Sequence, residues 1–152
     1  MFECPFCEIA HTDVDGFVSR RFNKAELNDI CDVVMFTPMN PCVDGHLLFV
    51  PSIHIDNIGD TRTGAGNVVA ATYKAIQLYL AEFPMDANVI TNNEANADQT
   101  VFHLHVHLIP REYNDGVTLP WTWQKKEQEE LALDKIQKKY FELVLNIFLK
   151  KK

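Results

Sequence analysis

The sequence predicts an α+β fold, with an antiparallel sheet of about five strands and two main helices. Three observations lead to this class. Short apolar runs follow one another closely in the first third of the chain, a segment with helical periodicity begins near residue 63, and a second such segment fills the last third. Strands that succeed one another through short turns, with helices set apart from them, favour an antiparallel sheet.

Each expected strand has its own signal. Residues 15–22 include an Asp-Gly turn, residues 31–38 end at a proline, and residues 45–51 are almost wholly apolar, as in a buried central strand. The close spacing of these runs predicts an antiparallel meander. A fourth strand is expected at the start of residues 87–100, and a fifth in the histidine-rich stretch that ends at Pro110.

Two segments carry a helical period. Residues 63–83 place apolar side chains three and four positions apart, and Pro84 closes the segment. Residues 125–152 repeat the pattern and predict a C-terminal helix. Trp121 and Trp123, which precede it, are expected to serve packing. No repeat or linker divides the chain, so residues 1–152 are expected to form a single domain.

Composition excludes several classes of function. The net charge of −7 disfavours a protein that coats nucleic acid or an anionic membrane, because both demand a basic surface. A site for one small nucleotide needs no such surface. We find neither an apolar run of transmembrane length nor a signal peptide, so a cytoplasmic location is expected. In that reducing compartment the four cysteines are read as metal ligands or buried thiols.

Three histidines occupy alternate positions, at His103, His105 and His107. On a strand they would share one face at intervals of about 6.6–6.8 Å, while Phe102, Leu104, Val106 and Leu108 would face the core. Such a set favours a metal site or nucleophilic catalysis over structural histidines, because each buried imidazole needs partners for both ring nitrogens. The polar loop before the strand, residues 92–100, is expected to expose backbone N–H groups that hold an anion. A histidine nucleophile beside such a loop points to phosphoryl or nucleotidyl transfer.

These residues carry a resemblance. The run Gln99-Thr100-Val101-Phe102-His103-x-His105-x-His107 resembles the signature of the histidine triad family of nucleotide hydrolases and transferases. The upstream segments "GHLLFVPSIH" and "CPFC" resemble two further segments of the zinc-bearing branch, in the right order over residues 2–112. The resemblance implies a fold of that type, a nucleotide as the small-molecule partner, and a homodimer.

The resemblance also implies roles. His105 would attack the α-phosphate of a dinucleoside polyphosphate or a nucleoside phosphoramidate and form a covalent nucleotidyl-histidine. His107 would contact the phosphate and assist the leaving group, and His46 would support the hydrogen bonds of the triad. Thr100 would contact the scissile or leaving atom. Substrate binding would involve the set Asn92, Gln99, Thr100, His105 and His107, and Mg²⁺ is expected only as a companion of a polyphosphate substrate.

Two positions depart from the family pattern. Asp98 stands where the family has a glycine whose backbone N–H approaches the phosphate, and a carboxylate there is unfavourable for an anion unless it points away. Pro38 stands where the family has an Asp or Asn that binds the ribose hydroxyls. Thr37 or Asn40 is the expected substitute for that interaction.

Cys4 and Cys7 have the spacing of half a zinc knuckle, within a segment covering residues 1–10. By itself the spacing leaves a redox dithiol or two ordinary thiols open. The resemblance adds His54 and His103 as ligands, which would complete a structural Cys₂His₂ zinc site. The remaining cysteines, Cys31 and Cys42, are expected to be buried or incidental, and His11 to lie on the surface.

Two other classes of function compete with the enzyme. One is a non-catalytic nucleotide-binding or regulatory module with structural zinc, which the departures at Asp98 and Pro38 favour. The other is a metalloenzyme whose catalytic ion is held by the triad itself.

Overall fold

The computed structural model describes residues 4–12 and 16–118. The chain divides into two compact units, residues 1–117 and residues 118–152. The expected helix at 125–152 and the two tryptophans lie outside the described residues. The single-domain organisation stays a prediction.

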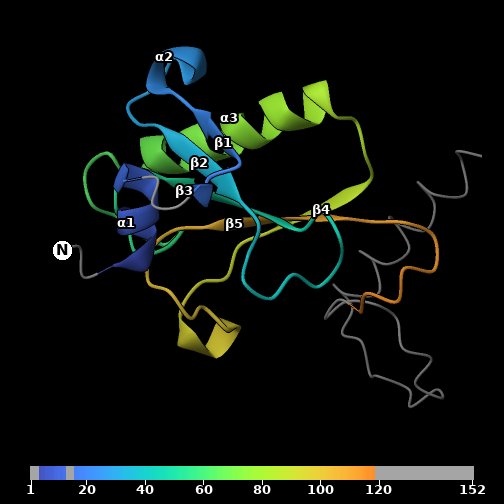
Figure 1. Cartoon of the computed structure of the whole chain (residues 1–152). Helices are drawn as coiled ribbons and strands as arrows, with labels where there is room; N and C mark the ends of the chain where they lie inside the picture. The colour runs from blue at the N-terminus through green and yellow to red at the C-terminus, as the bar shows by residue number, and fades with distance from the viewer. Residues whose placement is uncertain (1–3, 13–15, 119–152) are drawn as a thin grey trace, which may run out of the picture. The chain divides into compact units, whose positions relative to one another are not determined.

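Five strands form one antiparallel sheet (Figure 1). They are β1 (Arg20–Phe22), β2 (Val33–Phe36), β3 (Leu47–Pro51), β4 (Ala87–Ile90) and β5 (Val106–Pro110). Their order in the sheet is β1-β2-β3-β5-β4, and every neighbouring pair is antiparallel. The predicted fold class and the predicted meander of the first three strands are therefore confirmed. The expected strand at residues 15–22 is shorter than predicted, because only its last three residues pair with β2.

The long helix α3 (Ala65–Glu82) matches the segment predicted to be helical. It ends where Phe83 donates its N–H to the carbonyl of Tyr79, just before Pro84. Three short elements were not predicted from the sequence. They are α1 (Pro5–Thr12), α2 (Lys24–Leu27) and the 3₁₀ turn η2 (Ala95–Ala97). Cys7 lies within α1 and Cys4 immediately precedes it. Because α1 contacts β3, the helix places both cysteines of the "CPFC" segment against the sheet.

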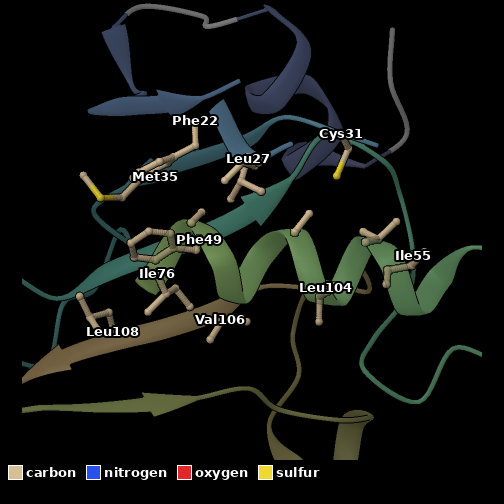
Figure 2. Close-up of a cluster of buried hydrophobic side chains, with 14 of the residues drawn as sticks. Phe22, Leu27, Cys31, Met35, Phe49, Ile55, Ile76, Leu104, Val106 and Leu108 are labelled. Carbon is tan, nitrogen blue, oxygen red and sulfur yellow. The ribbon is translucent and has the colours of Figure 1, made fainter. Parts of the chain in front are cut away.

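Both faces of the central strands are buried, which explains their continuous apolar runs. Successive residues of β2 and β3 alternate between two clusters of buried side chains. The larger cluster lies between the sheet and α3, where Figure 2 shows Phe49 and Ile76 among its members. The smaller cluster lies on the other face, where side chains of α1 pack against Val34, Phe36, Leu48 and Val50. Helix α1 is therefore part of the core on the face opposite α3.

The histidine-rich segment becomes a strand later than predicted. β5 begins at Val106, so only His107 of the three histidines is in the strand. Pairing with β3 starts at Phe49↔Val106, and the N–H of Leu104 bonds instead to the carbonyl of Ile55, outside the sheet. The predicted core set holds for Leu104, Val106 and Leu108, which are fully buried. It is wrong for Phe102, which is 47% exposed, because the period-two alternation does not extend before the strand.

No helix among residues 4–12 and 16–118 combines the length and apolar character needed to cross a bilayer. The central position of β5, between β3 and β4, sets where the candidate site lies. His107 is paired with Leu48 on one side and with Ile90 on the other. The residues just before β5 therefore lie beside the end of β3, because β5 runs antiparallel to β3 and its first residue, Val106, is paired with Phe49.

Candidate active site and metal cluster

His46 and His107 form a hydrogen-bonded pair whose direction can be assigned. The N–H of Cys42 donates to Nδ1 of His46 over 3.2 Å, so this nitrogen is an acceptor. A neutral His46 therefore carries its proton on Nε2, which lies 2.9 Å from Nδ1 of His107. His107 accepts that bond and must carry its own proton on Nε2. Cys42, His46 and His107 thus form a chain of hydrogen bonds, called the relay below, and His107 presents its Nε2–H to the site as a donor.

The neighbouring His105 is oriented by the backbone. Its Nδ1 lies 2.8 Å from the carbonyl oxygen of His103, which can only accept, so Nδ1 carries the proton. The Nε2 atom therefore bears a lone pair, and it has no partner among the described residues. The rings of His105 and His107 are in contact, with centroids 5.2 Å apart. A lone pair on one imidazole and an N–H donor on the next thus lie side by side.

Burial keeps these imidazoles neutral. Desolvation lowers the pKa of His46 and of His105 below the usual value for histidine. It lowers the pKa of His107 to about 4, and repulsion from His105 and His46 adds to the effect. Because these pKa values are lowered and not raised, His105 and His107 are both neutral at physiological pH, one as a nucleophile and the other as a hydrogen-bond donor.

The loop before the histidines is held by hydrogen bonds within itself. The expectation that its backbone N–H groups are exposed to an anion is therefore wrong for part of the loop. The backbone N–H groups of residues 97–99 bond to carbonyls within the loop, so they do not face an anion. Buried Gln99 donates from Nε2 to the carbonyls of Asp56 and Val101, while its Oε1 accepts from the N–H of Glu94. Gln99 therefore positions the loop. Thr100 is exposed, and neither its hydroxyl nor its N–H has a partner within residues 4–12 and 16–118.

Asp98 occupies a backbone conformation that explains why a glycine is common at such a position. Its φ is 62°, in the left-handed region, which Asp and Asn tolerate better than most other residues with a side chain. The amide of Asn92 donates to the carbonyl of Asp98 over 3.3 Å and ties the two ends of the loop together. At the ribose position, Pro38 is partly buried, whereas Thr37 and Asn40 are exposed after β2.

The four predicted metal ligands come together. The ligand atoms of Cys4, Cys7, His54 and His103 all lie within 4.8 Å of one another. Cys4 and Cys7 are adjacent to or within α1, His54 follows β3, and His103 precedes β5, so three separate segments contribute. Burial and the neighbouring Cys4 raise the pKa of the Cys7 thiol to about 11, so a bound cation would have to displace its proton.

The geometry of this cluster fits a tetrahedral ion. The distances from sulfur to Nδ1 are 3.5 Å for Cys4–His103, 3.3 Å for Cys7–His54 and 3.4 Å for Cys7–His103. Tetrahedral zinc with ordinary bond lengths would separate sulfur from nitrogen by about 3.6 Å. Both imidazoles are also held at the other nitrogen. Nε2 of His103 lies 2.9 Å from the carbonyl of Pro51, and Nε2 of His54 lies 3.0 Å from Asp56. Such outer contacts are typical of metal-binding histidines.

Two residues near the site were missed by the sequence analysis. The ring of Phe6, on α1, contacts His105 edge-on at 5.2 Å and Phe36 at 5.7 Å. The hydroxyl of Thr91 donates to the carbonyl of His105 over 2.8 Å and anchors it to the end of β4. The signal for Phe6 was available, since it lies between the two cysteines, but its direction depends on a helix that was not predicted.

The remaining cysteines differ from one another. Cys31 is buried, and desolvation raises the pKa of its thiol to about 11. Cys42 is exposed, and its N–H is the donor to His46, so its backbone contributes to the relay. The expectation of a buried or incidental role therefore holds for Cys31 and misses the backbone contact of Cys42. His11 is exposed, as predicted.

The chain belongs to the HIT-domain family, whose model matches residues 26–114. Among curated relatives, adenylylsulfatase HINT3 of Arabidopsis thaliana is 30% identical over 88% of this chain, which spans 63% of the relative's length. Adenosine 5′-monophosphoramidase HNT1 of Saccharomyces cerevisiae is 27% identical, over 85% of this chain and 76% of the relative. The structure of a histidine triad protein from Clostridium difficile superimposes with a TM-score of 0.61 and 26% identity, over 82% of this chain and 98% of that one.

Proposed function

We propose that this protein is a nucleotide hydrolase or nucleotidyl transferase that acts at the α-phosphate of a nucleoside phosphate derivative through a nucleotidyl group on His105. The observation that carries the proposal is the assignment of ring nitrogens. His105 presents a lone pair at Nε2, next to a His107 that presents an N–H donor. A nucleophile paired with a proton donor is what displacement at phosphorus requires.

The proposed reaction has two steps. Nε2 of His105 attacks the α-phosphorus, and the bond from phosphorus to the leaving nitrogen or oxygen breaks. The N–H of His107 donates a hydrogen bond to the phosphate oxygens and the departing atom and stabilises the charge that develops there, while the leaving group takes up a proton from water; the attacking water of the second step returns one proton to the solvent. His46 donates from Nε2 to His107 and keeps that ring in the correct tautomer. Water or another acceptor then attacks the phosphorus and releases His105.

The loop supplies the remaining contacts of the proposal. The hydroxyl and N–H of Thr100 donate to the phosphate or to the leaving atom, because both are unpaired in the described structure. Asn92 lies at the opposite end of the same loop and faces the phosphate with its second amide hydrogen. Gln99, which the sequence analysis counted among the substrate-binding residues, acts as a brace because its amide is already saturated. The names of the two curated relatives, an adenylylsulfatase and an adenosine phosphoramidase, support this substrate class.

The cluster of Cys4, Cys7, His54 and His103 is proposed to hold structural zinc. The donor set is that of a closed site, with four protein ligands and no position left for a substrate. When bound, the ion would link α1 to the segment that precedes β5. It would thereby hold the carbonyl of His103, which orients His105.

Neither rival function is favoured by the geometry. Within residues 4–12 and 16–118, the metal-type cluster includes His103 alone of the triad, so a catalytic ion held by all three histidines has no support. The non-catalytic module remains the second candidate, on the strength of Asp98 and Pro38. The homodimer, the accompanying Mg²⁺ and the cytoplasmic location stay predictions from sequence.

Adduct trapping tests the proposal. Wild-type protein and His105→Ala are mixed with adenosine 5′-phosphoramidate, quenched and analysed by intact-mass spectrometry, with turnover followed in parallel. We expect an adenylyl adduct on the wild type and loss of turnover by about a thousandfold or more in His105→Ala, because the nucleophile is removed. The control is His11→Ala, which removes an exposed histidine and should behave as the wild type. A His105→Ala protein that keeps its turnover would refute the nucleophile. Nucleotide binding without any adduct or turnover would favour the module.

A further inference from the structure

Glu94, in the loop before the histidines, has a backbone conformation that residues with a side chain rarely adopt. Its φ is 72° and its ψ is 166°. Conformations of this kind are almost confined to glycine, and for other residues the strain makes them about 5- to 150-fold rarer. They persist only where the surrounding structure holds them. The conformation of Glu94 therefore requires contacts that oppose the strain.

Each polar group of Glu94 has a partner within the described residues. Its N–H donates to Oε1 of Gln99 over 2.9 Å, and its carbonyl accepts from the N–H groups of Ala97 and Gln99. Its carboxylate accepts from Nδ2 of Asn57 over 2.7 Å. Of these partners only Asn57 lies outside the loop, and it is 5% exposed. The contact between Asn57 and Glu94 therefore attaches the loop, at its strained residue, to the segment that follows β3.

Gly59 holds the neighbouring residue of the loop. Its N–H lies 3.1 Å from Oδ1 of Asn93 and 2.9 Å from Oδ1 of Asn57. A Cβ at Gly59 would lie 3.0 Å and 3.2 Å from the same two oxygens, so a larger residue would crowd both side chains. Residues 57–59 thus hold two consecutive loop residues, Asn93 and Glu94. These two directly follow Asn92, which is proposed to face the phosphate.

We propose that Asn57 and Glu94 form a clamp that positions the loop for phosphate binding. The amide of Asn57 holds Glu94 in its strained conformation, and without this contact the loop relaxes. Asn92 and Thr100, at the two ends of the loop, then no longer face the phosphate together. Asn57 and Glu94 are positioning residues, because neither is proposed to touch the substrate. Their role toward the substrate rests on the proposed function, since it requires a phosphate beside His105.

Three substitutions of Glu94 separate the strain from the hydrogen bond. Glu94→Gln keeps an acceptor oxygen for Asn57, Glu94→Ala removes the acceptor and keeps the strain, and Glu94→Gly removes both. Glu94 is exposed, so all three variants should fold. In Glu94→Ala we expect KM for adenosine 5′-phosphoramidate to rise about tenfold, with kcat changed by less than about twofold, as when the ordered loop falls to about a tenth of its population. In the other two variants KM should stay within about twofold of the wild type, because the clamp is kept or is no longer needed.

A glycine at the next position is the matched control. Ala95 is also exposed, but it begins the 3₁₀ turn η2 and its φ is not positive. Ala95→Gly therefore adds flexibility without relieving strain. It should leave KM unchanged by itself and should not restore KM when combined with Glu94→Ala. Equal KM values in Glu94→Ala and Glu94→Gly would overturn the clamp, and so would a wild-type KM in Glu94→Ala.

Asn57→Ala tests the clamp from the other side. It should raise KM in the wild-type background and have a much smaller effect in the Glu94→Gly background, where no strain remains to be held. A merely structural role of Asn57 would raise KM by the same factor in both backgrounds, and that result would refute the positioning role.

Hydrogen exchange over residues 91–100 reports on the loop without any substrate. Exchange should be faster in Glu94→Ala than in the wild type, and slower in Glu94→Gly than in Glu94→Ala. If exchange follows this order but the wild type does not turn over adenosine 5′-phosphoramidate, the clamp is supported and the proposed function fails. Turnover by the wild type, with the same exchange in all variants, would overturn the clamp alone.

Discussion

The candidate metal cluster and the candidate active site each contain two or more histidines, and the histidines of the two sites use opposite ring nitrogens. In the metal cluster, Nε2 of His103 and His54 is held by a carbonyl and a carboxylate, and Nδ1 faces the cysteines. In the candidate active site, Nδ1 of His105 and of His107 has a hydrogen-bond partner, and Nε2 of each ring has none among the described residues. In each imidazole, the hydrogen-bond partner of one ring nitrogen determines whether the other nitrogen is available as a metal ligand, a nucleophile or a donor.

The histidines at positions 103, 105 and 107 are evenly spaced in the sequence, but their rings fall into these two different arrangements. His103 and His105 are two residues apart, yet one ring is turned towards the cysteines and the other towards His107. A single atom connects them, because the carbonyl of His103 receives the Nδ1–H of His105. The backbone carbonyl of the first histidine therefore sets the tautomer of the second.

Removing the relay should give the largest effect on the active-site half of this comparison. His46→Ala deletes the donor to Nδ1 of His107 and frees that ring to adopt the wrong tautomer. We expect kcat to fall by about a hundredfold, the lower end of what a positioned proton donor contributes, while metal content stays unchanged. Steady-state kinetics together with metal analysis check this prediction. An unchanged kcat would show that His107 does not depend on His46.

Removing a ligand of the candidate metal cluster should affect metal content and stability more than catalysis. Cys7→Ser should release the metal and lower Tm by about 10 °C, since a link between distant segments is lost. We expect kcat/KM to fall by no more than about tenfold at a temperature where the variant is folded, because His105 and His107 remain.

Cys31→Ser is the matched control for that variant. Cys31 is also a buried cysteine whose thiol pKa is raised to about 11, but it lies outside the cluster. It should keep its metal and differ from the wild type only by the smaller cost of a buried hydroxyl. Metal that remains bound in Cys7→Ser would contradict the ligand assignment.

The pH dependence should show the smallest change. Burial lowers the pKa of His46 and holds that of His107 near 4, so the relay stays neutral as the pH falls. Between pH 7.5 and 6.0 we therefore expect kcat/KM to fall by a smaller factor than it would for a site with ordinary histidine pKa values. A histidine with an ordinary pKa would lose about fourfold over that range through protonation. A profile of kcat/KM against pH measures this, and an acid limb centred near pH 6.5 would contradict the neutral relay.

Much of the fold was predictable because its signals are local. The apolar runs of β2 and β3 and the period of α3 are properties of neighbouring residues, and the structure confirms them. Helix α1 was missed because its eight residues are too few to show a clear helical period and its position depends on contacts with the other face of the sheet. β5 began late because Leu104 bonds to Ile55, a partner that alternation within the segment cannot reveal.

The residues of the candidate site could be predicted from the sequence, but the ring nitrogen that each histidine presents could not. The pattern of histidines and cysteines predicted which side chains would gather, and the cluster of Cys4, Cys7, His54 and His103 forms as expected. The choice of ring nitrogen depends on the carbonyls of Pro51 and His103 and on the N–H of Cys42, which every residue type shares. The inward-facing amide of Gln99 had no signal in sequence for the same reason.

The separation of the metal ligands along the chain has a consequence for the timing of folding. Cys4 and His103 are 99 residues apart, and Cys7 and His103 are 96 apart. A ribosome adds about 5–20 residues per second, so the cysteines emerge roughly 5–20 s before their last ligand exists. During synthesis the two thiols must therefore remain reduced without their partners.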